Sequence, residues 1–312
     1  MEKLNTLSIV CPCYNEENNV FPLYERLQKV INGIVGYEFE IIFIDNSSTD
    51  ETAERLRELA RLDSRVKVII NARNFGHNRS PFWALLQTSG EAAVIMAADL
   101  QDPPEYVPQL ISEWEKGWKV VMAQKPESKT GVVMHALRKF YYWLLNKISS
   151  VRLIEDANGF GIYDKKVIAY MAEMNDPNPY IRGMVCEIGF PIKTIKYVQD
   201  SRHSGSSKNN LYALYDQAML GFVSHSVIPL RVSSAIGFLL SGISFLFAII
   251  YLGLKLSNWD KFSAGIAPII VGGLFIFGLI FIFLGLLGEY IASIQLFVKK
   301  RPMVVEQERI NF

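Results

Sequence analysis

The chain has 312 residues, of which half are hydrophobic and 20% are charged, and its formal net charge is +1. This charge balance gives no basic field of the kind that a nucleic-acid-binding protein presents. The length is sufficient for two domains and for a sizeable buried core. Three cysteines without zinc-site spacing predict free thiols in a β-core, not a disulfide framework or a metal site.

The first part of the chain alternates short apolar runs with segments of helical spacing. We expect buried strands over residues 7–11, 40–44, 66–70 and 92–97. Helices are expected over residues 18–31 and after Asp50, which can cap the second of them. This alternation predicts an α/β domain with a mostly parallel sheet and helices on both faces.

Two long apolar runs follow, over residues 232–256 and 264–287. Each has enough residues to cross a hydrocarbon core of about 30 Å as a helix, so we expect a two-helix transmembrane hairpin. Lys and Arg flank the outer ends of both runs, which predicts a cytosolic N-terminal domain and tail, at the plasma membrane if the organism is bacterial. The expected units are a catalytic domain (1–208), a juxtamembrane amphipathic helix (209–231), and the hairpin with its cytosolic tail (232–312).

Residues 134–148 mix basic residues with aromatic and aliphatic ones, and residues 209–227 carry several aromatic and aliphatic residues. This composition favours helices that lie in a membrane interface. The alternative for each is a helix packed on the soluble domain.

Residues 97–108, AADLQDPPEYVP, come directly after the fourth predicted strand. Asp99 and Gln101 are two residues apart, so in an extended segment they present oxygen atoms on one face. Such oxygens, with those of a substrate diphosphate, suit a hard divalent cation, Mg²⁺ or Mn²⁺. An Asp-rich turn that merely caps a helix is the competing interpretation.

The strings CPCYNEENN, IDNSSTDET, ARNFGHNRS and AADLQDPPE, in this order, resemble family 2 glycosyltransferases of the GT-A fold. They look closest to the polyprenyl-phosphate branch, which includes enzymes like dolichyl-phosphate mannose synthase and bactoprenol glucosyltransferase. The resemblance extends over nearly the whole chain.

The resemblance implies a set of site residues. Those expected to hold the nucleoside are Pro12, Tyr14, Glu16 and Asp45. Ala98 is expected against the donor, with Asp99 and Gln101 on the metal. The cations expected to face donor and acceptor phosphates are Lys125, Arg202 and Lys208.

The sequence also departs from the family pattern. The usual DDGS reads Asp45-Asn46-Ser47-Ser48, and the usual DAD reads Ala97-Ala98-Asp99. The usual GDFR has become NGFG, with glycine at positions 159 and 161. These departures leave the donor sugar and the strength of metal binding open.

We expect inverting transfer of a hexose from a nucleotide-diphosphate sugar, with a UDP-sugar favoured, to undecaprenyl or dolichyl phosphate. A phosphate acceptor is already largely dianionic near neutral pH, so it attacks without a strong protein base. If a base is needed, Asp156 is the candidate, although a solvated acidic turn explains it equally well. The alternatives are a saccharide-elongating glycosyltransferase and a non-catalytic membrane scaffold. The resemblance further implies a homo-oligomer, often a tetramer.

Overall fold

The computed structural model describes residues 5–124, 154, 157–198, 266–299 and 301–312, with scattered positions between 230 and 250. The described strands are β1 (Asn5–Cys13), β2 (Tyr37–Asp45), β3 (Val66–Asn71), β4 (Ala92–Ile95), β5 (Val120–Gln124), β6 (Ala157–Asp164), β7 (Ile192–Lys196) and β8 (Glu306–Ile310). The described helices are α1 (Val20–Ile31), α2 (Thr52–Leu62), α3 (Arg79–Leu86), the 3₁₀ turn η1 (Pro104–Tyr106), α4 (Val107–Glu115), α6 (Lys165–Glu173), α7 (Ile181–Ile188) and α10 (Ile266–Val298).

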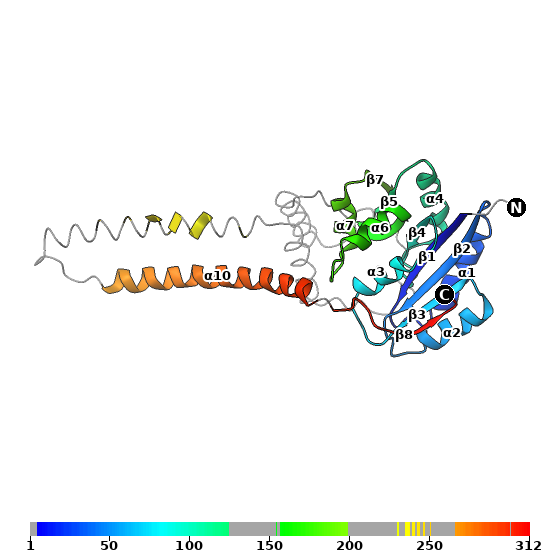
Figure 1. Ribbon diagram of the computed structural model, residues 1–312, viewed down its shortest axis with the longest axis horizontal. Helices are drawn as coiled ribbons and strands as arrows, with labels where there is room; N and C mark the ends of the chain where they lie inside the picture. The colour runs from blue at the N-terminus through cyan, green and yellow to red at the C-terminus, as the bar shows by residue number, and fades with distance from the viewer. Residues whose placement is uncertain are drawn as a thin grey trace, which may run out of the picture.

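The strands form one eight-stranded sheet in the order β7-β5-β6-β4-β1-β2-β3-β8 (Figure 1). Strands β3, β2, β1 and β4 are parallel neighbours, as the sequence predicted. Strand β6 is antiparallel to both β4 and β5, and β8 is antiparallel to β3. The α/β class is confirmed, and the sheet is mixed, with β5 and β7 a fourth parallel pair beside three antiparallel ones among the described strands. The prediction rested on the first four strands, and the later strands bring the antiparallel pairs.

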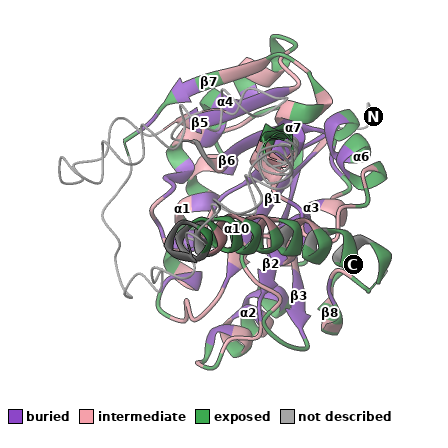
Figure 2. Cartoon of the chain, turned by 90° about the vertical axis from the view of Figure 1, so that its left-hand side faces the viewer, coloured by how far each residue is buried: buried purple, intermediate pink, exposed green. Residues whose placement is uncertain are grey.

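Helices cover both faces of the sheet because its central strands are apolar on both sides. Ile9 and Ile41 face one core with buried residues of α1, α2 and α4. Val10 and Ile42, one position further along each strand, face a second core with residues of α3, α6 and α7. This period-2 alternation follows from the pleat of a strand. Figure 2 shows the result as buried strands between helices with exposed outer faces.

Helix α10 extends away from the α/β domain (Figure 1). In the part of the chain that the structure describes, no helix combines the length and apolar character required to cross a membrane. The predicted two-span hairpin within residues 232–312, and the multi-pass membrane localisation that depended on it, are therefore corrected. That prediction came from the composition of two runs, and composition alone does not establish a span. The segments 134–148 and 209–227, predicted to be interfacial helices, lie outside the described residues.

The C-terminal segment returns to the α/β domain and adds the edge strand β8, which the sequence analysis did not anticipate. Val304 is buried, and the carbonyl oxygen of Val305 accepts a hydrogen bond of 2.9 Å from the backbone N–H of Ala72. The side-chain amide of Asn311 donates to the carbonyl oxygens of Ala60 and Val66, each over 2.8 Å. Strand β8 thereby covers the edge of β3, which would otherwise present unpaired backbone groups.

Long-range side-chain contacts also hold β8. The guanidinium group of Arg57 on α2 lies 2.8 Å from the carboxylate of Glu308. On the other side, the indole N–H of Trp83 on α3 donates to Glu306, 2.5 Å away. The tail is thus bound to helices on both faces of the sheet.

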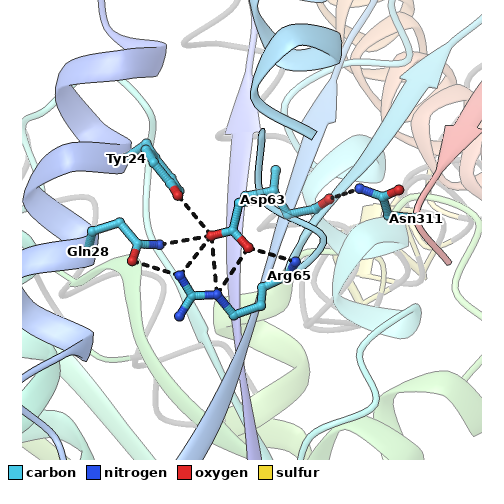
Figure 3. Close-up of polar contacts among 6 residues, drawn as sticks. Tyr24, Gln28, Asp63, Arg65 and Asn311 are labelled. Atoms are coloured by element: carbon cyan, nitrogen blue, oxygen red, sulfur yellow. Dashed lines mark hydrogen bonds and ion pairs between the residues drawn. The ribbon is translucent and has the colours of Figure 1, made fainter. Parts of the chain in front are cut away.

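Asp63, in the turn between α2 and β3, accepts hydrogen bonds from α1 and from the turn itself (Figure 3). Its carboxylate accepts from the Tyr24 hydroxyl at 2.8 Å, from the Gln28 amide at 3.3 Å and from the Arg65 backbone N–H at 2.9 Å. Hydrogen bonds from the Arg65 side chain are the largest cause that lowers the pKa of Asp63, to about 2. The turn is therefore tied to α1 by an ionised carboxylate.

Replacing Asp63 with asparagine is expected to lower the free energy of unfolding by about 1 kcal/mol at pH 7. A depressed pKa stabilises the fold above the ordinary value of 3.8, and this contribution is lost as the pH falls through about 2. Urea unfolding of both proteins between pH 7 and pH 2 should show the difference narrowing below pH 4. Glu58→Gln, an exposed change on α2, is the control, and a difference independent of pH would contradict this account.

Candidate active site

The predicted site residues lie where the parallel strands end. The backbone N–H of Asn46 donates to the carbonyl oxygen of Cys13 over 3.0 Å, and that of Ala98 donates to Pro12 over 3.4 Å. These bonds join the segments that follow β1, β2 and β4. Pro12, Asp45 and Ala98 are therefore brought to one edge of the sheet, the usual position of a ligand crevice in α/β proteins.

The loops after β1 and β2 are bonded to each other. The backbone N–H of Asn15 donates to the Ser48 hydroxyl, and that of Glu16 to the Thr52 hydroxyl, each over 2.8 Å. Asn15 and Ser47 both have left-handed backbones, with φ of 56° and 62°. Such conformations cost of order 1 kcal/mol or more in residues other than glycine, and they concentrate at functional sites. The loops after β1 and β2 therefore hold each other in a fixed conformation.

Asp45 is 1% exposed at the end of β2. Its carboxylate accepts a hydrogen bond from the Ser48 backbone N–H at 3.1 Å and another from the Ser48 hydroxyl. Burial raises the pKa of Asp45, and the hydrogen bonds from Ser48 oppose this rise. The carboxylate is thus held in one orientation at the edge of the sheet.

Asp99 and Gln101 lie together in the loop after β4. The backbone N–H of Gln101 donates to Asp99 Oδ1 over 3.1 Å, across a left-handed Leu100 with φ of 61°. Both Asp99 and Gln101 are half-buried. Within the described ranges, no three His, Cys, Asp or Glu side chains cluster in a way that could hold a metal ion. The metal-binding role of Asp99 and Gln101 stays a prediction.

Asp102 has a structural role in the same loop. One carboxylate oxygen accepts from the backbone N–H of Ala97 at 3.2 Å, and the other accepts from the Tyr197 hydroxyl at 2.9 Å. Asp102 is 4% exposed. It therefore fixes the segment that leads from β4 to Asp99.

A cleft of about 190 Å³ opens beside this loop. Its wall includes Pro12 and Ala97 from the predicted motifs, and also His77, Tyr180 and Arg182. The guanidinium carbon of Arg182 lies 4.9 Å from the centre of the Tyr180 ring. The sequence analysis sought phosphate-facing cations only at Lys125, Arg202 and Lys208, and so missed Arg182 at the start of α7. The pair of aromatic and basic residues in NPYIRG was the available signal.

Four predicted site residues cannot be placed. Lys125, Asp156, Arg202 and Lys208 lie outside the residues that the structure describes.

The two glycines in NGFG are required by the backbone. Gly159 has φ of 96°, in the left-handed region that favours glycine. Gly161 lies in β6 between β4 and β5, and a Cβ atom built there would be 2.3 Å from the carbonyl oxygen of Val121. The usual Asp at position 159 would therefore strain this backbone, and the usual Arg at position 161 would clash with Val121.

Gly161→Ala is expected to lower the free energy of unfolding by about 2 kcal/mol, because β5 and β6 would have to separate. Gly33→Ala is the matched control, since its Cβ would meet Val30 at an ordinary 3.4 Å. Urea unfolding of the two variants measures the difference. Equal stabilities would show that the strands have room at Gly161.

Comparison with known proteins decides the family. The model of Glycosyl transferase family 2 matches residues 8–173, from β1 through α6. The chain belongs to this family. The enzyme class, a glycosyltransferase, is confirmed, and so is the resemblance stated from the motifs.

This family 2 glycosyltransferase has similar relatives over almost its full length. It is 35% identical to the uncharacterised glycosyltransferase YkcC of Bacillus subtilis, over 96% of this chain and 93% of that protein. It is 32% identical to the bactoprenol glucosyl transferase of Shigella phage SfX, over 97% of this chain and 99% of that protein. Glucosyl-3-phosphoglycerate synthase of Mycobacterium tuberculosis, solved with Mn²⁺, UDP-glucose and phosphoglyceric acid, shares the fold. Its TM-score is 0.50 at 19% identity, over 70% of this chain and 79% of that one.

Proposed function

We propose that this glycosyltransferase moves a hexose, with glucose the first candidate, from a nucleotide-diphosphate sugar to a polyprenyl phosphate. The observation that carries the proposal is the 32% identity to the bactoprenol glucosyl transferase of phage SfX, which extends over both chains almost completely. Similarity at this extent includes the segments after the family domain, which ends at residue 173. The segments outside the family domain therefore also support the same class of acceptor, a polyprenyl phosphate, for this chain.

For the donor, we assign the nucleoside to the edge formed by Pro12, Tyr14, Glu16 and Asp45. This assignment is supported by the mutual hydrogen bonds of the two loops, which fix their conformation at this edge. Ala98 is 1% exposed, beside Asp99, and is assigned to the wall against the donor.

The donor set Asp99 and Gln101 offers hard oxygen ligands, which fit Mg²⁺ or Mn²⁺. Two protein ligands are sufficient only if the donor diphosphate supplies further oxygens, as is usual for magnesium sites. When bound, such an ion would neutralise the charge that develops on the leaving diphosphate.

The residues of this chain then have to align the donor with the acceptor. An acceptor phosphate oxygen attacks the anomeric carbon, the bond to the donor diphosphate breaks, and the configuration inverts. A second phosphate pKa of about 6 means that the attacking oxygen is already without its proton. Asp45 and the loop of Asp99 orient the donor, and Lys125, Arg202 and Lys208 are assigned to the phosphates. Asp156 remains the candidate base if one is needed.

The test is transfer of labelled sugar to lipid phosphate by the purified full-length protein in detergent. UDP-glucose, UDP-galactose, UDP-N-acetylglucosamine and GDP-mannose are each offered with undecaprenyl phosphate and Mg²⁺ or Mn²⁺. We expect labelled polyprenyl-phosphate sugar with at least one donor. Label that appears only on an added oligosaccharide would replace the proposal with saccharide elongation. Donor binding without transfer would indicate a non-catalytic protein.

The homo-oligomer, a tetramer by resemblance, stays a prediction. Sedimentation velocity of the same preparation would test it.

A further inference from the structure

Asn46 stands where the family motif has its second acidic residue, and it is 7% exposed. Its side-chain N–H₂ group donates to Asn74 Oδ1 over 3.0 Å and to the Gly76 carbonyl oxygen over 3.1 Å. Its Oδ1 accepts from the Asn71 side chain over 3.1 Å and from the Phe75 backbone N–H over 2.9 Å. Both donors and both acceptor positions of the amide are therefore used.

The residues that bond to Asn46 extend this hydrogen-bond network to β3, to the loop after β3 and to α3. The Asn71 amide, at the end of β3, also donates to the Ser80 hydroxyl in the first turn of α3, over 3.0 Å. Asn74 Oδ1 accepts a second hydrogen bond, of 2.8 Å, from the Gly76 backbone N–H. The Asn46 side chain, in the loop after β2, therefore holds residues 72–78, which connect β3 to α3, through hydrogen bonds on their buried side.

An ionised aspartate at position 46 could not make the same four hydrogen bonds. A carboxylate would keep the acceptors for Asn71 and Phe75, but it has no hydrogens for Asn74 Oδ1 and Gly76 O. It would place a negative charge about 3 Å from two oxygen acceptors in a buried position. The acceptors for the Asn46 amide are supplied by the segment NARNFG.

The fastened loop leads directly to the cleft. His77 and Asn78 follow Gly76, and both line the cleft together with Gly159 and Tyr180. The loop turns at Gly76, whose φ is 91°. A loop released from Asn46 would move His77 and Asn78 without disturbing the Ser48 contacts that orient Asp45.

We propose that Asn46 is a positioning residue, whose amide fixes loop 72–78 so that His77 and Asn78 form the wall against the transferred sugar. This proposal rests on the proposed function for the identity of the sugar end of the site. Asn46 would thus contribute to recognition of the sugar, whereas Asp45 and its neighbours would bind the nucleoside.

The test compares Asn46→Asp with Asn32→Asp, the same change at an exposed position. Backbone hydrogen exchange within residues 71–80 should become at least tenfold faster in Asn46→Asp and should stay unchanged in Asn32→Asp. The kcat/KM for the nucleotide sugar should fall by about tenfold or more, while the dissociation constant of UDP changes less than twofold. Asn74→Ala, at an exposed position, should reproduce the faster exchange if Asn46→Asp does not fold.

Each arm can overturn the proposal. Unchanged exchange in both Asn46→Asp and Asn74→Ala would show that the amide does not fasten the loop. Equal losses of UDP binding and of kcat/KM would mean that Asn46 acts on the nucleotide itself. If the wild-type protein transfers no sugar, the proposed function fails, and the exchange experiment still decides the loop.

Discussion

Replacing Asp99 with asparagine is expected to lower kcat/KM for sugar transfer by about 10²–10³-fold, with the fold unchanged. The loss is that of one charged ligand of the cation that would neutralise the leaving diphosphate, an electrostatic effect usually of about 3–4 kcal/mol. Asparagine is nearly isosteric and retains an oxygen for the Gln101 backbone N–H, which donates to Asp99 over 3.1 Å. A change in activity would therefore report the lost charge and not a collapsed loop.

The measurement is initial rate against Mg²⁺ or Mn²⁺ concentration at saturating acceptor. Asp99→Asn should require a higher metal concentration for half-maximal rate, and isothermal titration should show weaker metal-dependent binding of UDP. Glu58→Gln, an exposed carboxylate on α2, is the control for loss of one negative charge. Wild-type metal dependence in Asp99→Asn would remove this residue from the cation site.

Removing residues 303–312 is expected to lower the free energy of unfolding by about 3 kcal/mol. Burial of Val304 alone stabilises by about 1.5–3 kcal/mol. Each hydrogen bond to Asn311 and β8 adds about 1 kcal/mol, and the conformational entropy regained by the freed tail offsets part of the sum. For a domain of this size the melting temperature should fall by about 6–12 °C. The bare edge of β3 should also increase aggregation, which light scattering detects.

Two point variants test whether the stability gained from the tail comes from burial of Val304. Val304 is 5% exposed, whereas Val305 is 47% exposed. Val304→Asp should approach the effect of the deletion, because it buries a charge without a partner. Val305→Asp should change stability by less than about 0.5 kcal/mol. Equal effects of the two substitutions would show that the tail does not dock as described.

The strongly patterned part of the fold was predictable from sequence. The four predicted strands over residues 7–97 correspond to β1 to β4, because apolar runs bounded by turn residues form buried parallel strands. Strand β8 was not predictable in this way. Its sequence, EQERI, has few apolar residues, and its partners are Arg57, Trp83 and β3, more than 220 residues earlier.

Some residues of the candidate site were also predictable from sequence, and others were not. Asp99 was found because an acidic residue directly after a buried strand is a local signal, and Asp45 was found through the resemblance of its motif to the family. The role of Asn46 was not found, since a missing acid in a motif indicates only a lost group. Its partners, Asn71, Asn74 and Gly76, become neighbours only when β2 and β3 pair.

The return of the tail makes the α/β domain discontinuous along the chain. Strands β7 and β8 lie at opposite margins of the sheet, seven strand spacings or about 34 Å apart. From the strand directions, β7 ends and β8 begins at the same end of the sheet, the one that carries Asp45 and Asp99. A shortened chain that keeps the whole sheet would therefore need residue 198 joined to residue 302 by a bridge of at least about ten extended residues. A protease cut between those positions would leave two polypeptides that remain associated through β3 and β8.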